Sequence, residues 1–262
     1  MDTLRIGWVQ MDIAWEAPLS NITRVERLIQ GKQADLWVLP EMWSTGFSME
    51  TDKAEPEGGV AYQAMREWAE KYQALLLGSL QVRIENRARN RAYAILPDGR
   101  TYFYDKRHLF RIAGESLHYE AGDRHLVVEW KGWHIAPLIC YDLRFPVWSR
   151  RRPDYDYDLL VYIANWPESR HAHWSALLPA RAIENQAYVL GVNRIGVDGN
   201  QHHYLGGSML LDYKGEMLLH AGNTEGAFVA EIRKSPLVAY RERFPVWRDS
   251  DSFQFSPEPF WG

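Results

Sequence analysis

Short apolar segments of strand length recur along the chain, and they are joined in two different ways. A tight turn joins some of them, as at 97–100, where Pro-Asp-Gly-Arg separates two strand-like runs. Helical stretches join others, because apolar residues at helical spacing between 19 and 29 follow the strand expected at 4–11. Hairpins interleaved with strand–helix units predict mixed sheets covered by helices, which is a layered α/β sandwich.

The chain has 262 residues and shows no internal repeat, low-complexity tract or linker. A single α/β domain can reach this length and can bury a large core without disulfides. We therefore expect one domain over residues 1–243. Residues 244–262 are rich in proline and aromatic residues, and we expect them to form an arm that lies on the body of the protein or on a partner subunit.

Composition excludes several classes of protein. The formal net charge of −4 gives no basic footprint for nucleic acid, and no apolar run reaches the roughly 18 residues of a membrane span. The single cysteine and the absence of a signal-peptide pattern at the N-terminus favour the cytoplasm. The close histidine pairs, His171-x-His173 and His202-His203, have no second cysteine to complete a zinc site, so we expect no metal and no cofactor.

Three residues with different chemical functions follow strand-like segments. Cys140 follows the apolar run 133–139 at a turn into a helix, where a thiol would face a pocket beside backbone N–H groups that should lower its pKa. Glu41 follows the strand expected at 35–40, and Lys106 ends another strand-like run. Open α/β sheets bind ligands at strand ends. A nucleophile, a general base and a cation for developing negative charge would meet there.

Each of the three residues also has an ordinary structural interpretation. A lone cysteine is commonly a small core residue, a glutamate in a loop is commonly solvated, and a lysine commonly lies on the surface. A Cys–His hydrolase is an alternative, since nine histidines are available, but it leaves Glu41 and Lys106 without a role. A variant that lacks His173 would distinguish the two hydrolases. A non-catalytic scaffold would be expected to lack one of the three groups, and all three are present.

The segments around these residues resemble the nitrilase superfamily of carbon–nitrogen hydrolases over nearly the whole chain. The resemblance is carried by six segments in the family's order: LPEMWSTGF at 39–47, YDKRHLF at 104–110, CYDLRFP at 140–146, YIANWP at 162–167, HWSALLPARAIENQAYV at 173–189 and GGSMLLDYKGE at 206–216. It implies a single-domain, four-layer α-β-β-α sandwich with mixed sheets. It also implies a Glu-Lys-Cys triad, whose roles fall on Glu41, Lys106 and Cys140.

Within the superfamily, the segments DKRHLFR, CYDLRFPVWSR and ARAIENQAYV are most similar to the omega-amidase branch. This resemblance implies hydrolysis of 2-oxoglutaramate or 2-oxosuccinamate to the 2-oxo dicarboxylate and ammonia through a cysteine thioester. Another small amide or a nitrile is the alternative substrate. A second catalytic glutamate is implied as well, with Glu115 as the candidate and Glu120 as its rival. The expected assembly is a homodimer or a higher homo-oligomer built on the helix at 172–186.

The distal carboxylate of such a substrate requires a cation or several hydrogen-bond donors. Arg170 is the candidate, because it follows the end of the strand at 159–164. Arg144 is expected to brace the nucleophile turn instead of contacting the substrate. The other expected contacts with the small-molecule amide are three neighbouring side chains and one backbone N–H for the oxyanion: Phe47, Trp166, His173 and Tyr141.

Overall fold

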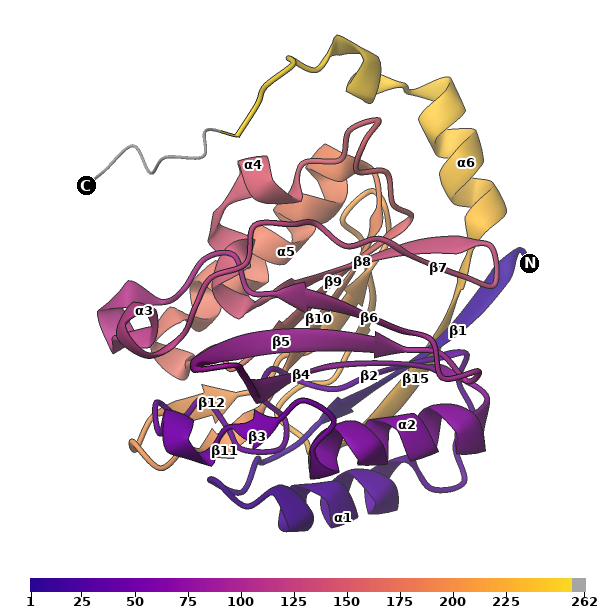
Figure 1. Cartoon of the computed structure of the whole chain (residues 1–262). Coiled ribbons are helices and arrows are strands. Elements are labelled where there is room, and N and C mark those ends of the chain that lie inside the picture. Colours follow the sequence, from indigo (N-terminus) through magenta and orange to yellow (C-terminus); the bar gives the residue numbers. More distant parts are fainter. Residues whose placement is uncertain (256–262) are drawn as a thin grey trace.

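A computed structural model describes residues 1–255 and contains two stacked sheets (Figure 1). The first sheet has seven strands, in the order β15 (Gly226–Arg233), β1 (Thr3–Gln10), β2 (Leu36–Val38), β4 (Leu75–Ile84), β5 (Arg87–Ile95) and β6 (Thr101–Asp105), with β3 (Glu55–Pro56) paired to β4. The second sheet has six strands, in the order β14 (Met217–His220), β13 (Met209–Leu211), β10 (Tyr188–Asn193), β9 (Leu159–Ala164), β8 (Trp133–Ile139) and β7 (Val128–Trp130). Both sheets mix parallel and antiparallel pairs.

Helices cover the outer faces of the two sheets. In Figure 1, α1 (Pro18–Ile29) and α2 (Val60–Tyr72) lie below the first sheet, and α4 (Pro146–Ser149) and α5 (His171–Asn185) lie above the second. The chain therefore has the expected four layers, and the predicted α-β-β-α sandwich is confirmed. Two helices were not predicted from the sequence: α3 (Glu115–His118) and α6 (Lys234–Arg243).

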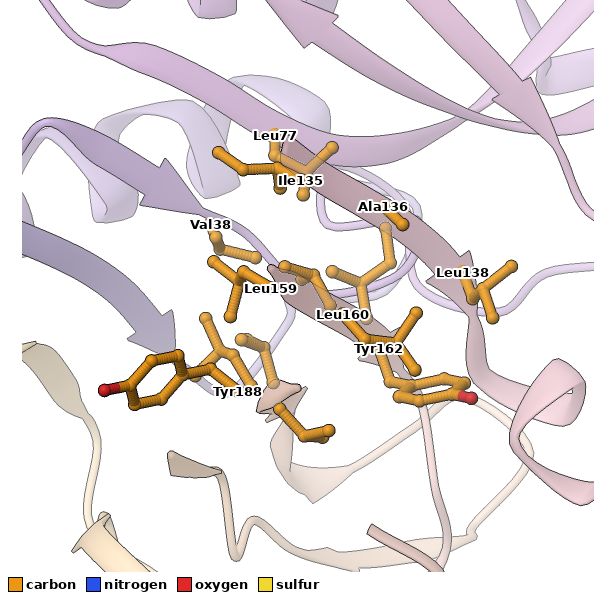
Figure 2. Close-up of a cluster of buried hydrophobic side chains, with 14 of the residues drawn as sticks. Val38, Leu77, Ile135, Ala136, Leu138, Leu159, Leu160, Tyr162 and Tyr188 are labelled. Atoms are coloured by element: carbon orange, nitrogen blue, oxygen red, sulfur yellow. The ribbon is translucent and has the colours of Figure 1, made fainter. Parts of the chain in front are cut away.

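The alternation of side chains along β2 sends them into two different clusters of the hydrophobic core. On β2, Leu36 and Val38 belong to the core between the sheets, whereas Trp37 packs into the core with α1 and α2. Figure 2 shows Val38 and Leu77 of the first sheet facing Ile135 and Leu159 of the second. These strands are buried on both faces, which explains why they are continuously apolar.

The strand expected at 189–195 ends at residue 193 in the structure, so that prediction was wrong for its last two residues. Strand β10 ends at Asn193, and Ile195 begins β11 (Ile195–Val197), which pairs with β12 (His203–Leu205) in a separate small sheet. Between them, the buried Arg194 side chain bonds to Asp12, and the Ile195 N–H donates to the Met11 carbonyl. These bonds direct the chain away from β9.

The described part of the arm lies against the body of the protein. It contains a short 3-10 helix, Val246–Asp249, and the ring of Phe255 packs 5.0 Å from that of Trp148. Residues 256–262 of the expected arm lie outside the described residues, and the domain boundary at 243 stays a prediction. Within residues 1–255, no helix has the length and apolar character needed to cross a membrane.

Candidate active site

Glu41, Lys106 and Cys140 line one cavity of about 620 Å³. Glu41 and Lys106 come from the first sheet, after β2 and β6, and Cys140 follows β8 of the second sheet. The β2 strand ends at Val38, so Glu41 lies three residues beyond the strand instead of directly at its end. The site is therefore assembled from both sheets, and it requires the sandwich to close.

The ammonium of Lys106 lies between two buried carboxylates. Its Nζ is 2.9 Å from Glu41 Oε1 and 2.9 Å from Glu115 Oε2, and none of the three side chains is exposed. Burial alone would lower the pKa of Lys106, but the two carboxylates outweigh burial and raise it above its usual value. Lys106 is therefore a fixed cation beside the thiol.

Glu115, and not its rival Glu120, belongs to this cluster. The Glu115 carboxylate accepts hydrogen bonds from Lys106 and from the backbone N–H of Phe110, and burial raises its pKa above the usual value. Glu120 pairs instead with Arg89 at 2.9 Å, and its side chain is 45% exposed. The structure thus places Glu115 where a second glutamate could act on Lys106.

Two asparagines that were not predicted from the sequence hold Glu41 in place. Asn90 Nδ2 donates to Glu41 Oε1 at 2.8 Å, and the backbone N–H of Asn165 donates to Glu41 Oε2 at 2.8 Å. The Asn165 side chain also donates to the Glu41 carbonyl at 2.7 Å. Asn165 follows β9 directly, so the strand-end criterion could have identified it.

The turn that carries Cys140 is held by Asp142. Cys140 has φ of 44°, a left-handed conformation that non-glycine residues rarely adopt, and it begins a 3-10 helix, Cys140–Arg144. The buried Asp142 carboxylate accepts hydrogen bonds from the Ile139 N–H at 3.0 Å, the Tyr104 hydroxyl at 2.7 Å and the His108 N–H at 3.0 Å. Asp142 therefore fastens the nucleophile turn to the segment that delivers Lys106.

The expectation that this turn lowers the thiol pKa was wrong. Burial is the largest influence on Cys140 and raises its pKa well above the usual value, and the charge of Glu41 acts in the same direction. Lys106 opposes both but does not outweigh them. With its pKa raised, the thiol needs a proton acceptor before the sulfur can attack.

The structure brings most of the expected substrate contacts to the cavity. Its lining includes four of them: Phe47, Tyr141, Trp166 and Arg170. Within residues 1–255, His173 is not part of the lining, and its Nδ1 accepts a hydrogen bond from the Arg144 guanidinium at 3.1 Å. Arg144 itself lines the cavity, so it faces the substrate space in addition to belonging to the nucleophile turn.

One wall of the cavity was not predicted from the sequence. It comes from the β11–β12 hairpin, which contributes Asp198, Asn200, His202 and Tyr204. Tyr204 donates its hydroxyl to Asp198 at 2.8 Å. The aspartate, glycine and asparagine at 198–200 are a turn signal that could have located the hairpin, though its short strands carry little apolar pattern.

Comparison with known proteins identifies the family. A family model described as carbon-nitrogen hydrolase matches residues 5–242. The omega-amidase YafV of Yersinia enterocolitica is 48% identical over 256 residues, which cover 97% of this chain and 99% of that protein. The 2-oxoglutaramate amidase of Bacillus subtilis is 35% identical and aligns with 93% of this chain and 96% of its own length.

A solved structure gives the same result. The crystal structure of XC1258 from Xanthomonas campestris, described as a CN-hydrolase superfamily protein with an arsenic adduct in the active site, superposes with a TM-score of 0.95. It is 43% identical, and the match covers 98% of this chain and 100% of that one. Sequence, fold and site geometry agree, and the chain belongs to the carbon–nitrogen hydrolase family.

Proposed function

We propose that this protein is an omega-amidase that hydrolyses 2-oxoglutaramate or 2-oxosuccinamate to the 2-oxo dicarboxylate and ammonia. The observation that carries the proposal is a single cavity that holds a thiol, a carboxylate and an ammonium together with two arginines. The relatives named omega-amidase YafV and 2-oxoglutaramate amidase support the same substrate class.

The first half of the reaction forms a thioester. Glu41 accepts the proton of the Cys140 thiol, and the sulfur attacks the amide carbon. The resulting oxyanion is stabilised by Lys106 and by the backbone N–H of Tyr141 at the start of the 3-10 helix. Glu41 then passes the proton to the amide nitrogen, the carbon–nitrogen bond breaks, and ammonia leaves.

The second half hydrolyses the thioester. Glu41 accepts a proton from a water molecule as its oxygen attacks the thioester carbon, and the same oxyanion contacts act again. The carbon–sulfur bond breaks, Glu41 returns the proton to Cys140, and the second carboxylate of the product is released. In this scheme Glu115 holds Lys106 against the reacting centre, since its carboxylate lies 2.9 Å from Nζ.

Two arginines are suited to bind the distal carboxylate of the substrate. The guanidinium carbon of Arg144 lies 4.7 Å from the centre of the Trp166 ring, and that of Arg170 lies 5.0 Å from the centre of the Phe110 ring. Neither has a carboxylate partner among the described residues, so both guanidinium groups can accept an anion from the substrate. A bidentate contact would orient the substrate with its amide toward Cys140.

Replacing either arginine should weaken binding of dicarboxylate monoamides specifically. For Arg144→Met and Arg170→Met, we expect KM for 2-oxoglutaramate to rise by roughly 10- to 100-fold, because a charge-assisted hydrogen bond to the carboxylate is lost. A neutral aliphatic amide is the matched control substrate, and its kcat/KM should change by less than about 3-fold if the arginines touch only the distal carboxylate. Equal losses on both substrates would contradict this assignment.

A substrate panel tests the proposed function directly. Ammonia release should be fastest with 2-oxoglutaramate or 2-oxosuccinamate and slower with glutamine and asparagine. The reason is that the omega-amidase branch, which the chain resembles, acts on the 2-oxo acid amides. A simple nitrile is the fifth member of the panel. Turnover confined to the nitrile would overturn the amidase assignment, and turnover of glutamine alone would change the substrate class.

The alternative of a Cys–His hydrolase finds less support in the site. The largest charged influences on the pKa of the Cys140 thiol come from Glu41, Lys106 and Glu115, and none of these three is a histidine. A variant that lacks His173 should therefore still release ammonia.

We also infer that the protein acts on a small molecule as a cytoplasmic homodimer, without nucleic acid or membrane as a partner. The single cysteine supports the location, and the net charge of −4 supports the absence of nucleic acid. Exposed apolar side chains on α5 and on the edge strand β14 support a subunit contact there: Ile183, Met217 and Leu218.

A further inference from the structure

Asn90 has an unusual position for a polar side chain. It lies in the interior of β5, opposite Gln81 of β4, and it is fully buried. Its backbone carbonyl accepts the N–H of Lys106 at 3.0 Å, so the same residue fixes the backbone of the lysine. Asn90 does not line the cavity, and it therefore acts on the chemistry only through other side chains.

The Asn90 amide faces both carboxylates of the site. Its Nδ2 is 2.8 Å from Glu41 Oε1 and 3.4 Å from Glu115 Oε1. A carboxylate accepts hydrogen bonds, so the NH₂ group and not the carbonyl must point toward these oxygens. In this orientation Asn90 Oδ1 is buried without a hydrogen-bond partner among residues 1–255. The task of this side chain therefore falls to its NH₂ end, which faces the two carboxylates.

The hydrogen bonds of Glu41 define that task. Oε1 accepts from Asn90 at 2.8 Å and from Lys106 at 2.9 Å, which fills its two lone-pair directions. Oε2 accepts one short bond, from the Asn165 N–H at 2.8 Å, and one long bond of 3.4 Å from the Asn165 side chain. Oε2 is therefore the oxygen that has capacity to accept a proton.

The sulfur lies beside the residue that bonds to Oε2. Cys140 Sγ is 3.9 Å from the Asn165 carbonyl oxygen, and the N–H of that same residue contacts Oε2. We propose that Asn90 is a positioning residue that occupies Oε1 of Glu41, together with Lys106, and so makes Oε2 the atom that exchanges the proton with Cys140. In this step the sulfur–hydrogen bond breaks and the Oε2–hydrogen bond forms. The inference deepens the proposed function, because it assigns the proton transfer to one oxygen.

The single cysteine allows a test that needs no substrate. Iodoacetamide alkylates the thiolate, and Cys140 is the one thiol in the chain, so the alkylation rate as a function of pH reports proton removal from Cys140. In Asn90→Asp, which keeps the shape but loses the donor, we expect alkylation and kcat to fall by roughly 10- to 100-fold, with KM changed by less than about 2-fold. The pH dependence of alkylation should also shift relative to the unmodified protein.

Two further variants separate positioning from folding. Asn90→Ser removes the amide without adding a charge, and its alkylation rate and kcat should also fall. This variant replaces Asn90→Asp in the test if Asn90→Asp does not fold. Asn21→Asp is the matched control, because Asn21 is equally buried but bonds to Ala14 and Ser44 away from both carboxylates. We expect the control to lower the melting temperature and leave the pH dependence of alkylation unchanged.

The outcomes distinguish this inference from the proposed function. One outcome is that both Asn90 variants are alkylated at the same rate and with the same pH dependence as the unmodified protein. That result would overturn the role of Asn90, whatever the substrate. If the panel amides are not hydrolysed but alkylation responds as expected, the omega-amidase assignment fails and the role of Asn90 in proton removal stands. A shift of equal size in Asn21→Asp would show that destabilisation alone produces the effect, and it would also overturn the proposal.

Discussion

Replacement of Cys140 by alanine is expected to reduce ammonia release by roughly 10⁴-fold or more, because it removes the atom that forms the thioester. Alanine keeps the Cβ, so the left-handed backbone at this position, φ of 44°, is strained to the same extent as before. The three hydrogen bonds that Asp142 accepts from Ile139, Tyr104 and His108 do not involve the sulfur. The variant should therefore fold normally and lose only its chemistry.

Ammonia release and the mass of the acid-quenched enzyme check this result together. The unmodified protein mixed with substrate should gain the mass of the acyl group, and Cys140→Ala should gain none. Cys140→Ser is the matched control for size and polarity, and its weaker nucleophile should also leave little activity. Retention of more than about a hundredth of the activity in the alanine variant would contradict covalent catalysis by Cys140.

The three residues that follow apolar runs could be predicted from the sequence for a physical reason. A strand that is buried on both faces must end where the chain reaches a polar environment, and an ionisable residue at that point faces the edge of the sheet. Cys140 fits this pattern directly, and Glu41 follows its buried strand after three residues, whereas Lys106 ends the half-exposed edge strand β6. The layered fold followed from the same alternation of apolar and polar segments.

Asn90 could not be predicted in this way. It lies among three arginines in the segment 87–91, where the sequence shows a charged strand and no strand end. Its contact with Glu41 depends on the register of β5 against its neighbours and on the path of the loop after β2, which are properties of the assembled sheet. The same limit applies to the Cys140 thiol, whose pKa is set mainly by burial and not by the local turn.

The two arginines illustrate a limit of reasoning from sequence proximity. Arg170 was expected to bind substrate because it follows a strand end, and it does line the cavity. Arg144 lies four residues after the nucleophile and was expected to be structural, but the 3-10 helix at 140–144 turns its guanidinium over Trp166 and into the cavity. A helical turn decides which side chain faces the ligand, and its exact pitch is not visible in the sequence.

Lys106→Met should be the most destabilising of these variants and nearly inactive. The side chain is fully buried between the carboxylates of Glu41 and Glu115, and methionine fills a similar volume without the charge. Removing one member of a buried ion cluster leaves uncompensated charge, at a cost of about 3–5 kcal/mol in the free energy of unfolding. Loss of an oxyanion contact should in addition reduce kcat by roughly 10²–10³-fold.

The destabilisation of Lys106→Met should depend on pH with a definite sign. Burial raises the pKa of Glu115 above its ordinary value of 4.5, and Lys106 opposes that rise. Without Lys106 the folded-state pKa rises further, so the folded protein binds more protons than the unfolded chain at pH values between 4.5 and the raised pKa. Stability is therefore lost as pH increases through this window, and the variant should be closer in stability to the unmodified protein at about pH 5 than at about pH 8.

Thermal melts at the two pH values measure this effect, and Lys53→Met is the matched control. Lys53 also pairs with a glutamate, Glu16, but its side chain is 57% exposed, so water replaces the lost partner. We expect the control to melt within a few degrees of the unmodified protein at both pH values. If Lys106→Met behaved like Lys53→Met, the carboxylates of the site would not depend on the lysine for their charge balance, and Lys106 could not be the fixed cation that the mechanism requires.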